Sequence, residues 1–236
     1  MNILIVNDDG IRAEGIWQLA RLAKKLGTVT IVSPLHQCSG MSHSISFEQE
    51  LFVRKVVSPI EDITAYSVSG RPADCVRVGI EHLTLEKPDI VFSGINLGYN
   101  IGYEILYSGT VGAAMEALTY GVPAIAFSQD NYDDFSAIET YFDEITDHLL
   151  HSDIAPNQIW NVNFPNATAN EIKGIDYDCI PAKALFHHDH FEMEQLGSQM
   201  YQIHTFYEKK KSAEAGTDMD SLLHNRIAVG RLTSIV

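Results

Sequence analysis

The sequence is poor in features that mark several classes of protein. Its 236 residues include three cysteines, Cys38, Cys75 and Cys179, which are widely spaced and form no CxxC pair, so neither a zinc site nor a disulfide framework is expected. The 16 lysines and arginines stand against 31 acids, a net charge of −15, which argues against electrostatic binding to long nucleic acids or anionic membranes. No apolar run reaches the roughly 18 residues of a membrane helix, and the first apolar stretch is too short for a signal peptide. We therefore expect a cytoplasmic protein.

The order of the apolar segments predicts an α/β fold. Residues 3–6, ILIV, form a continuous apolar run typical of a buried parallel strand, helical spacing follows over residues 15–26, and TVTIV at 28–32 is a second strand. This β–α–β opening fits a doubly wound sheet. Later segments continue the alternation, with helices predicted over 72–83, 110–120 and 134–150 and strands over 51–57, 65–68, 89–93, 122–127 and 159–164.

The last third is less regular. Residues 184–200 are rich in histidine, acids and methionine and show no clear period, whereas residues 200–207 alternate weakly, as a strand does. A short helix is predicted near residues 218–224, followed by a final strand near 226–236.

Three polar clusters follow the predicted strands. Asp8 and Asp9 come directly after the first strand, the loop 36–44 follows the second, and residues 93–100 follow the strand at 89–93. Because ligands of open α/β sheets bind outside the carboxyl ends of the strands, these clusters are expected to converge on one site.

The side chains of these clusters predict a site for a hard metal ion. Two adjacent carboxylates repel each other and resist burial unless a cation compensates them. The available ligands are carboxylates, hydroxyls and amide oxygens, from Asp8, Asp9, Ser39, Ser42, Asn96 and Asn100. Such ligands suit Mg²⁺, Mn²⁺ or Ca²⁺ rather than zinc or copper. The structural alternative is that the acid pair caps the following helix.

Two segments are candidates for holding an anion. The glycines of SGINLGYNIG at 93–102 indicate a loop, although small-residue helix packing is an alternative, and the segment matches neither a Walker P-loop nor GxGxxG. Ser108, Gly109 and Thr110 lie just before a predicted helix, where free backbone amides favour an anion. An ordinary helix N-cap explains the same residues equally well.

Several motifs, taken together and in order, resemble one known family. They are NDDG at 7–10, SG at 39–40, SGRPADCV at 69–76, SGINLGYNIG at 93–102, YSGTVGAAMEA at 107–117 and GVPAIAFS at 121–128. In sequence and spacing they resemble the SurE family of nucleoside monophosphate phosphatases over roughly residues 1–165. Shorter matches continue as NVNFP at 161–165 and GTD at 216–218.

This resemblance implies a Rossmann-like three-layer α/β/α core over residues 1–180. Residues 181–236 would form a C-terminal extension with a hairpin and the last helix and strand, used in oligomerisation. The family forms homodimers, often homotetramers, in which C-terminal segments are exchanged between subunits. Its members hydrolyse nucleoside 5′- and 3′-monophosphates, and some trim short polyphosphate.

The resemblance also implies which residues act. One divalent cation per subunit, Mg²⁺ or Mn²⁺, would be held by Asp8, Asp9, Ser39 and Asn96. Ser108, Gly109 and Thr110 would line the phosphate pocket, with Asn100 nearby. The chain departs from the family in the last third, where many relatives have an arginine- and proline-containing stretch and this sequence reads FHHDHFEMEQLGSQM. His187, His188 and His190 in this stretch lack an HxxxH spacing and are predicted to lie in a solvated loop rather than to bind a second metal.

The predicted reaction is metal-assisted hydrolysis of a phosphomonoester. Amides at Gly109 and Thr110 would stabilise the transferring group, and Asp8 or Asp9 would orient the attacking water. His43 is either a general acid or an ordinary loop histidine. A receiver-type signalling domain is disfavoured because the later strand ends offer neither a phospho-accepting aspartate nor its lysine, and a haloacid-dehalogenase-like enzyme would need an acid where Gly10 stands. A nucleotide-binding regulatory protein without turnover remains an alternative.

Overall fold

A computed structural model describes residues 1–130 and 133–235 of the chain. Its main sheet contains β1 (Asn2–Val6), β2 (Thr28–Pro34), β3 (Val53–Val56), β4 (Thr64–Val68), β5 (Ile90–Leu97), β6 (Ala124–Gln129), β7 (Gln158–Phe164), β8 (Ile175–Cys179) and β11 (Ile227–Thr233). The strand order is β3-β4-β2-β1-β5-β6-β7-β11-β8. Only the β3–β4 and β11–β7 pairs within this sheet are antiparallel. The predicted α/β class with a mainly parallel sheet is confirmed.

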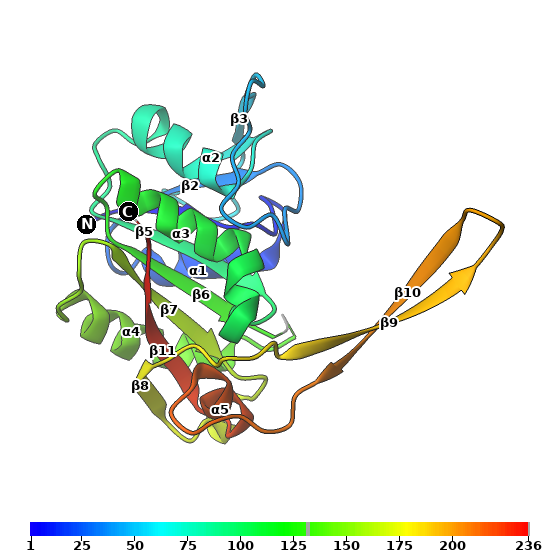
Figure 1. The fold of residues 1–236 in the computed structure, drawn as a ribbon. Coiled ribbons are helices and arrows are strands. Elements are labelled where there is room, and N and C mark those ends of the chain that lie inside the picture. Colours follow the sequence, from blue (N-terminus) through cyan, green and yellow to red (C-terminus); the bar gives the residue numbers. More distant parts are fainter. Residues whose placement is uncertain (131–132, 236) are drawn as a thin grey trace.

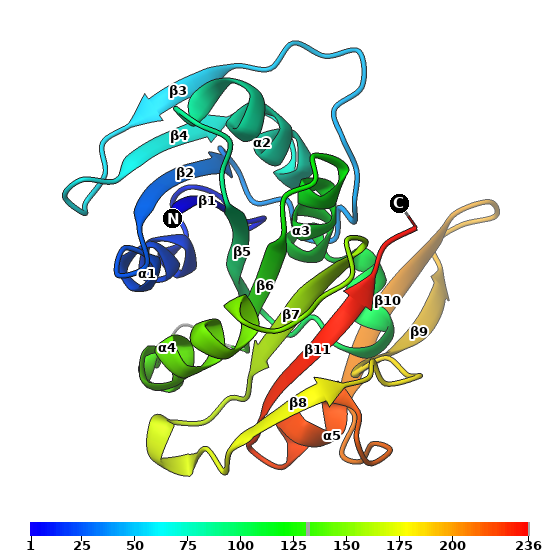
Figure 2. The ribbon, with the colours of Figure 1, turned by 90° about the vertical axis from the view of Figure 1, so that its left-hand side faces the viewer.

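Helices cover both faces of the sheet and create two apolar layers (Figures 1 and 2). On one face α1 (Glu14–Ala23) and α4 (Ser136–Leu150) pack through side chains such as Leu19 and Phe142 against Phe92 and Phe127 of the sheet. On the other face α2 (Pro72–Val78), which continues as the wider turn η1 (Gly79–Leu83), and α3 (Gly109–Thr119) cover the sheet. This arrangement follows from the sequence. Each helix has apolar residues on one side, and the central strands are apolar on both faces, so helices cover the sheet on both sides. No helix in the described ranges is both long enough and apolar enough to cross a bilayer.

The segment after residue 180 does not form one separate unit. β9 (His187–Gln195) and β10 (Tyr201–Lys209) form an antiparallel hairpin that projects away from the core (Figure 1). The helix α5 (Asp218–Leu223) packs in a small apolar cluster beside the sheet, and β11 then enters the sheet between β7 and β8. Residues after 180 thus form both the projecting hairpin and a strand of the main sheet, and the expected division at residue 180 stays a prediction.

Two local expectations were wrong. Residues 93–97 were predicted as loop, but they extend β5, because Asn96 and Leu97 pair with Ser128 and Gln129 of β6 beyond an irregularity at Ser93. A bulge of this kind is a common place for glycine within a strand. Residues 187–190 were predicted as a solvated loop but lie in β9, where their backbone pairs across the hairpin with residues 206–209.

Candidate active site

The turn after β1 delivers the acid pair to the carboxyl edge of the sheet. Asn7 is fully buried, and its side-chain amide donates to the carbonyl of Gly10 at 3.1 Å while its oxygen accepts from Ser33 at 2.6 Å. These bonds fix the turn at the end of β1. The helix α1 begins only at Glu14, and its N-cap, Ala13, makes no side-chain cap. Asp8 and Asp9 therefore do not cap that helix, and their side chains are directed to other elements.

Asp8 lies against the start of α3. Its carboxylate is 3% exposed and accepts a hydrogen bond of 2.6 Å from the hydroxyl of Thr110. A Cβ atom at Gly109 would stand only 2.9 Å from the Cβ and Oδ2 of Asp8, so this close approach requires glycine. Burial raises the pKa of Asp8 to about 6; the hydrogen bond from Thr110 opposes this shift and the charge of Asp9 adds to it. The start of α3 and the acid pair are thus in contact.

Asp9 connects the two other loops. Its Oδ2 accepts from the backbone amide of Leu97 at 2.9 Å, at the end of β5, and its Oδ1 accepts from the side-chain amide of Gln37 at 3.3 Å. The same nitrogen of Gln37 donates to the hydroxyl oxygen of Ser39 at 3.0 Å. Gln37 therefore joins Asp9 to Ser39, and the loop after β2 meets the acid pair as predicted. Gln37 itself was not predicted from the sequence.

Asn96 lies at the same edge of the sheet as the acid pair. The residue is 8% exposed and precedes Leu97, whose amide reaches Asp9. Its side-chain nitrogen donates to the carbonyl of Gly98 at 2.7 Å, which leaves the amide oxygen as the atom suited to a cation. The edge of the sheet thus brings together Asp8, Asp9, Ser39 and Asn96.

These four residues fit a hard divalent cation. They offer carboxylate, hydroxyl and amide oxygens, and burial beside Asp9 raises the pKa of Asp8, a cost of charge that a bound cation would offset. No cluster of three or more His, Cys, Asp and Glu side chains suited to a metal occurs in residues 1–130 and 133–235. Two carboxylates, a hydroxyl and an amide oxygen form a different set of donors. Such oxygen donors favour Mg²⁺ and Mn²⁺ over zinc.

Ser108 caps α3, and the first turn of the helix faces the acid pair, where the backbone amide of Thr110 also interacts with Asp8. The hydroxyl of Ser108 accepts from the amide of Val111 at 3.0 Å, so the N-cap interpretation of this segment is correct. The amides of Gly109 and Thr110 belong to the first turn, where no helical carbonyl can reach them. Ser93 of β5 donates to the carbonyl of Thr110 at 2.7 Å and fixes the turn on the sheet. The cap and an anion site are thus compatible.

Asn100 lies buried in the turn after β5, against β6 and β7. It is 5% exposed and its side-chain nitrogen donates to Ser128 at 2.8 Å. Its backbone amide donates to Asn163, and its carbonyl accepts from both Asn161 and Asn163, at distances of 2.8 to 3.2 Å. These contacts tie the turn after β5 to β6 and β7.

His43 lies on the other side of the Ser39 loop and faces α3. Its Nε2 is 2.6 Å from Oε2 of Glu116, and Arg77 lies 3.7 Å from the other oxygen of this carboxylate. The backbone at Ser42 and His43 passes so close to Gly112 that a side chain there would clash, and the amide of Ser42 donates to Tyr107 at 2.9 Å. Glu116 was missed by the sequence analysis, although a lone acid in the apolar run VGAAMEA is a usable signal.

Comparison with known protein families shows to which family the chain belongs. A family model described as "Survival protein SurE" matches residues 3–184. The chain belongs to the SurE family. It is 44% identical over 179 residues to a protein of Clostridium botulinum (strain 657 / Type Ba4) named 5′-nucleotidase SurE, covering 74% of this chain and 71% of that one. A 5′-nucleotidase SurE of Flavobacterium psychrophilum is 38% identical over 187 residues, covering 78% of this chain and 72% of that one.

The same family relationship holds for the fold. A crystal structure of the SurE protein from Aquifex aeolicus superimposes with a TM-score of 0.86 and is 34% identical, covering all of this chain and 95% of that one. The predicted SurE resemblance is therefore confirmed, and the similarity in fold extends beyond the residues of the family model to the hairpin and the last strand.

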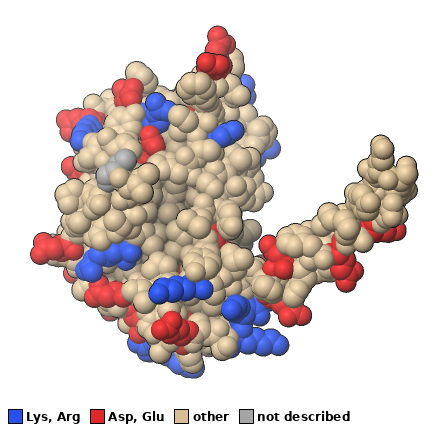
Figure 3. All heavy atoms as spheres, viewed as in Figure 1, with Lys and Arg blue, Asp and Glu red and all other residues tan. Residues whose placement is uncertain are grey.

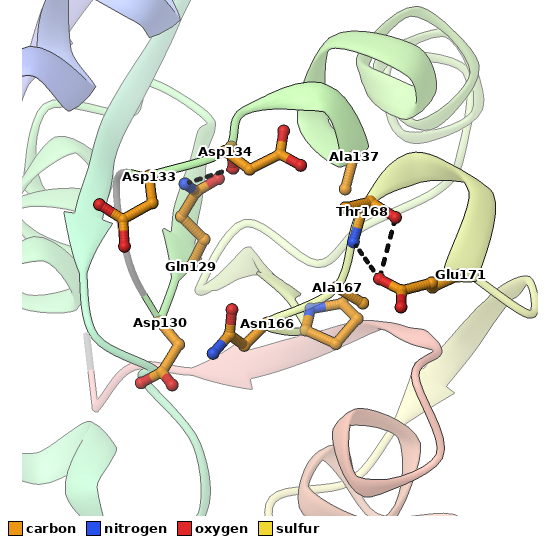
Figure 4. Close-up of a pocket in the computed structure, with 10 residues that line it drawn as sticks. Gln129, Asp130, Asp133, Asp134, Ala137, Asn166, Ala167, Thr168 and Glu171 are labelled. Atoms are coloured by element: carbon orange, nitrogen blue, oxygen red, sulfur yellow. Dashed lines mark hydrogen bonds between the residues drawn. The ribbon is translucent and has the colours of Figure 1, made fainter.

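This SurE-family chain also has a cavity lined by acidic side chains that follow β6 and β7. It has a volume of about 340 Å³ and opens between the ends of β6 and β7 (Figure 4). Asp130, Asp133, Asp134 and Glu171 line it together with polar neighbours. Gln129 donates to the carbonyl of Asp134 at 3.3 Å, and Glu171 accepts from the amide and the hydroxyl of Thr168, both at 2.9 Å. The first turn of α4 borders this cavity at Ala137, but the four carboxylates that line it disfavour a phosphate, so it is not the candidate phosphate site.

Proposed function

We propose that the chain is a 5′-nucleotidase that hydrolyses nucleoside 5′-monophosphates, and also 3′-monophosphates, to nucleoside and phosphate. The observation that carries the proposal is the contact between Asp8 and the first turn of α3 through Thr110, because it joins a cation-binding acid pair to an anion-binding helix end. Two SurE proteins of similar sequence carry the name 5′-nucleotidase. Short-chain polyphosphate is a further proposed substrate, since its terminal group presents the same phosphoryl oxygens.

The proposed cofactor is one divalent cation per subunit, Mg²⁺ or Mn²⁺, held by Asp8, Asp9, Ser39 and Asn96. When bound, such a cation supplies charge neutralisation at the phosphoryl oxygens and a water of lowered pKa. The chain itself fixes the ligands: Thr110 orients Asp8, Leu97 and Gln37 orient Asp9, and Gln37 also reaches Ser39.

The remaining groups bind and orient the phosphate. The amides of Gly109 and Thr110, with the positive end of the α3 dipole, stabilise negative charge that develops on the transferring group. Asp8 or Asp9 orients the attacking water as a hydrogen-bond acceptor. We propose that His43 positions the Ser39 loop through Glu116 instead of acting as the general acid, since its Nε2 is engaged with that carboxylate at 2.6 Å.

A substrate panel tests this function directly. Phosphate release is measured from the four common nucleoside 5′-monophosphates, from 3′-AMP and from tripolyphosphate, each with Mg²⁺, with Mn²⁺ and with a chelator. We expect release from the 5′-monophosphates that stops with the chelator and returns with added metal. Binding of nucleotides without release from any of them would instead support a regulatory nucleotide-binding protein.

We further propose that the protein is a homodimer or homotetramer whose contacts include the hairpin. One face of the hairpin is apolar and largely exposed, with Phe191, Met193, Ile203 and Tyr207 between 53% and 67% exposed. Figure 3 shows this hairpin extending away from the body of the molecule with acidic side chains along one edge. Light scattering is expected to give a dimer or larger for the wild type and a smaller species for Met193→Lys with Ile203→Lys. An unchanged mass would exclude this face from the interface.

A further inference from the structure

The segment η2 (Gly102–Tyr107) lies between the base of the hairpin and the phosphate-binding turn. It is a 3-10 helix whose last residue is followed directly by Ser108, the N-cap of α3. The carbonyl of its Tyr107 accepts from Ser42 in the loop that carries Ser39. A displacement of η2 would therefore move both residues 108–110, which are proposed to bind phosphate, and the loop that carries Ser39, a proposed metal ligand.

The chain leading into the hairpin holds η2 from the opposite side. The amide of Tyr103 donates to the carbonyl of Ala184 at 2.9 Å. Gly102 has a φ of +52° and its Cα faces the same carbonyl so closely that no side chain fits there. Buried Asp218 accepts from the amides of Gly102 and Ala182, both at 2.9 Å. The start of η2 is thus pinned to the hairpin base by backbone contacts.

Glu104 makes the side-chain contact between η2 and the hairpin strand. One oxygen of its carboxylate accepts from the backbone amide of His187 at 2.7 Å and lies 3.1 Å from Nδ1 of the same residue. The imidazole packs edge-on against the rings of Phe186 and Tyr207, with centroid distances of 5.0 and 5.3 Å. The Glu104 side chain is only 16% exposed, so this bond is protected from water and holds the first residue of β9.

We propose that Glu104 is a positioning residue that couples the hairpin to the phosphate site. By holding His187 it fixes η2, and η2 sets the place of Ser108, Gly109 and Thr110 relative to Asp8. A displacement of the hairpin would in this way change the position of the residues proposed to bind phosphate, and hence the affinity for phosphate. The inference rests on the proposed function, but its structural part does not require turnover.

Kinetics and hydrogen exchange of matched variants test this coupling. Glu104→Ala is expected to raise the KM for a nucleoside monophosphate and the inhibition constant of inorganic phosphate roughly tenfold, with kcat within about twofold. Glu104→Gln keeps an acceptor oxygen for His187 and is expected to stay close to the wild type. Amides of residues 102–112 are expected to exchange faster in Glu104→Ala but not in Glu104→Gln. His187→Ala loses the contact of the imidazole with Glu104 but keeps the bond from the backbone amide of residue 187. We expect it to raise the KM and the exchange rates by less than Glu104→Ala does.

The control is Glu194→Gln, in the same hairpin. Its carboxylate lies 3.3 Å from His204 across the hairpin and is exposed, so η2 should be unaffected. The proposal is overturned if Glu104→Ala leaves the KM and the exchange of residues 102–112 unchanged, if Glu194→Gln changes them equally, or if Glu104→Gln is as impaired as Glu104→Ala. A wild type without turnover would refute the proposed function alone, and the exchange measurement would then decide the coupling.

Discussion

Asp8→Asn is expected to abolish metal-dependent turnover and at the same time to make the metal-free protein more stable at neutral pH. The carboxylate is almost fully buried and lies next to Asp9, so its ionised form is unfavourable in the folded state without a cation. Asparagine has nearly the same shape, and its oxygen can still accept the hydrogen bond from Thr110. The substitution therefore removes the charge and keeps the local packing.

The pH dependence of this stability follows from the direction of the pKa shift. The pKa of Asp8 rises from an ordinary value of 3.8 to about 6 in the folded state, so the folded protein binds this proton more tightly than the unfolded chain does. Above about pH 6 the group destabilises the fold by up to about 3 kcal/mol, and this penalty disappears as the pH falls toward 4. Urea unfolding at pH 7 is thus expected to show Asp8→Asn more stable by about 1–3 kcal/mol, and at pH 4 the difference should be small.

The kinetic part of this experiment uses Asp9→Asn as the matched variant. Both substitutions are expected to lower the metal-dependent kcat/KM by at least about a hundredfold, because each removes a carboxylate of the proposed metal site. Asp9 is partly exposed, so the gain in stability should be confined to Asp8→Asn. Full activity in either variant would remove that carboxylate from the mechanism. A loss of stability in Asp8→Asn at pH 7 would contradict the claim that ionised Asp8 destabilises the metal-free fold.

Gly109→Ala is expected to be nearly inactive although it adds only a methyl group. The new Cβ would lie 2.9 Å from the Cβ and Oδ2 of Asp8, a spacing that forces the buried carboxylate or the first turn of α3 to move. Either movement separates the acid pair from the amides of Gly109 and Thr110, which we propose bind the phosphate. Since small displacements of positioned groups cost about a hundredfold in rate, we expect a loss of that order in kcat/KM.

The control for this substitution is Gly197→Ala, at the end of the hairpin, where an added Cβ meets no atom within 4 Å. It should leave phosphate release unchanged. Wild-type activity in Gly109→Ala would mean that the contact between Asp8 and α3 is not needed for the reaction. Circular dichroism and thermal unfolding of both variants would show whether the fold is retained.

The sequence was sufficient to predict the core and the acid pair. ILIV at residues 3–6 has no polar face, so a strand covered on both sides was the simplest prediction, and the charge of Asp8 and Asp9 directly after it indicated a cation site. The extension of β5 to Leu97 was missed, because glycine and asparagine in SGINL signal a loop and only the pairing with β6 reveals a strand.

The supporting contacts of the site could not be predicted in the same way. Gln37 reaches Asp9 across 28 positions of sequence, and Glu116 reaches His43 across 73. No local pattern specifies such pairs, since they depend on how the loop 36–47 folds over α3. The strand β9 was missed for a related reason: its histidines and acids have low strand propensity, and their pairing with β10 determines the structure.

The position of a bound metal tests the central claim most directly. Crystals of the protein grown with Mn²⁺ and inorganic phosphate would locate the ion by its anomalous scattering. We predict one Mn²⁺ per subunit within about 2.3 Å of oxygens from Asp8, Asp9, Ser39 and Asn96, with the phosphate against the amides of Gly109 and Thr110. An ion bound only in the cavity of Asp130 and Asp134, or only at the hairpin histidines, would contradict the account.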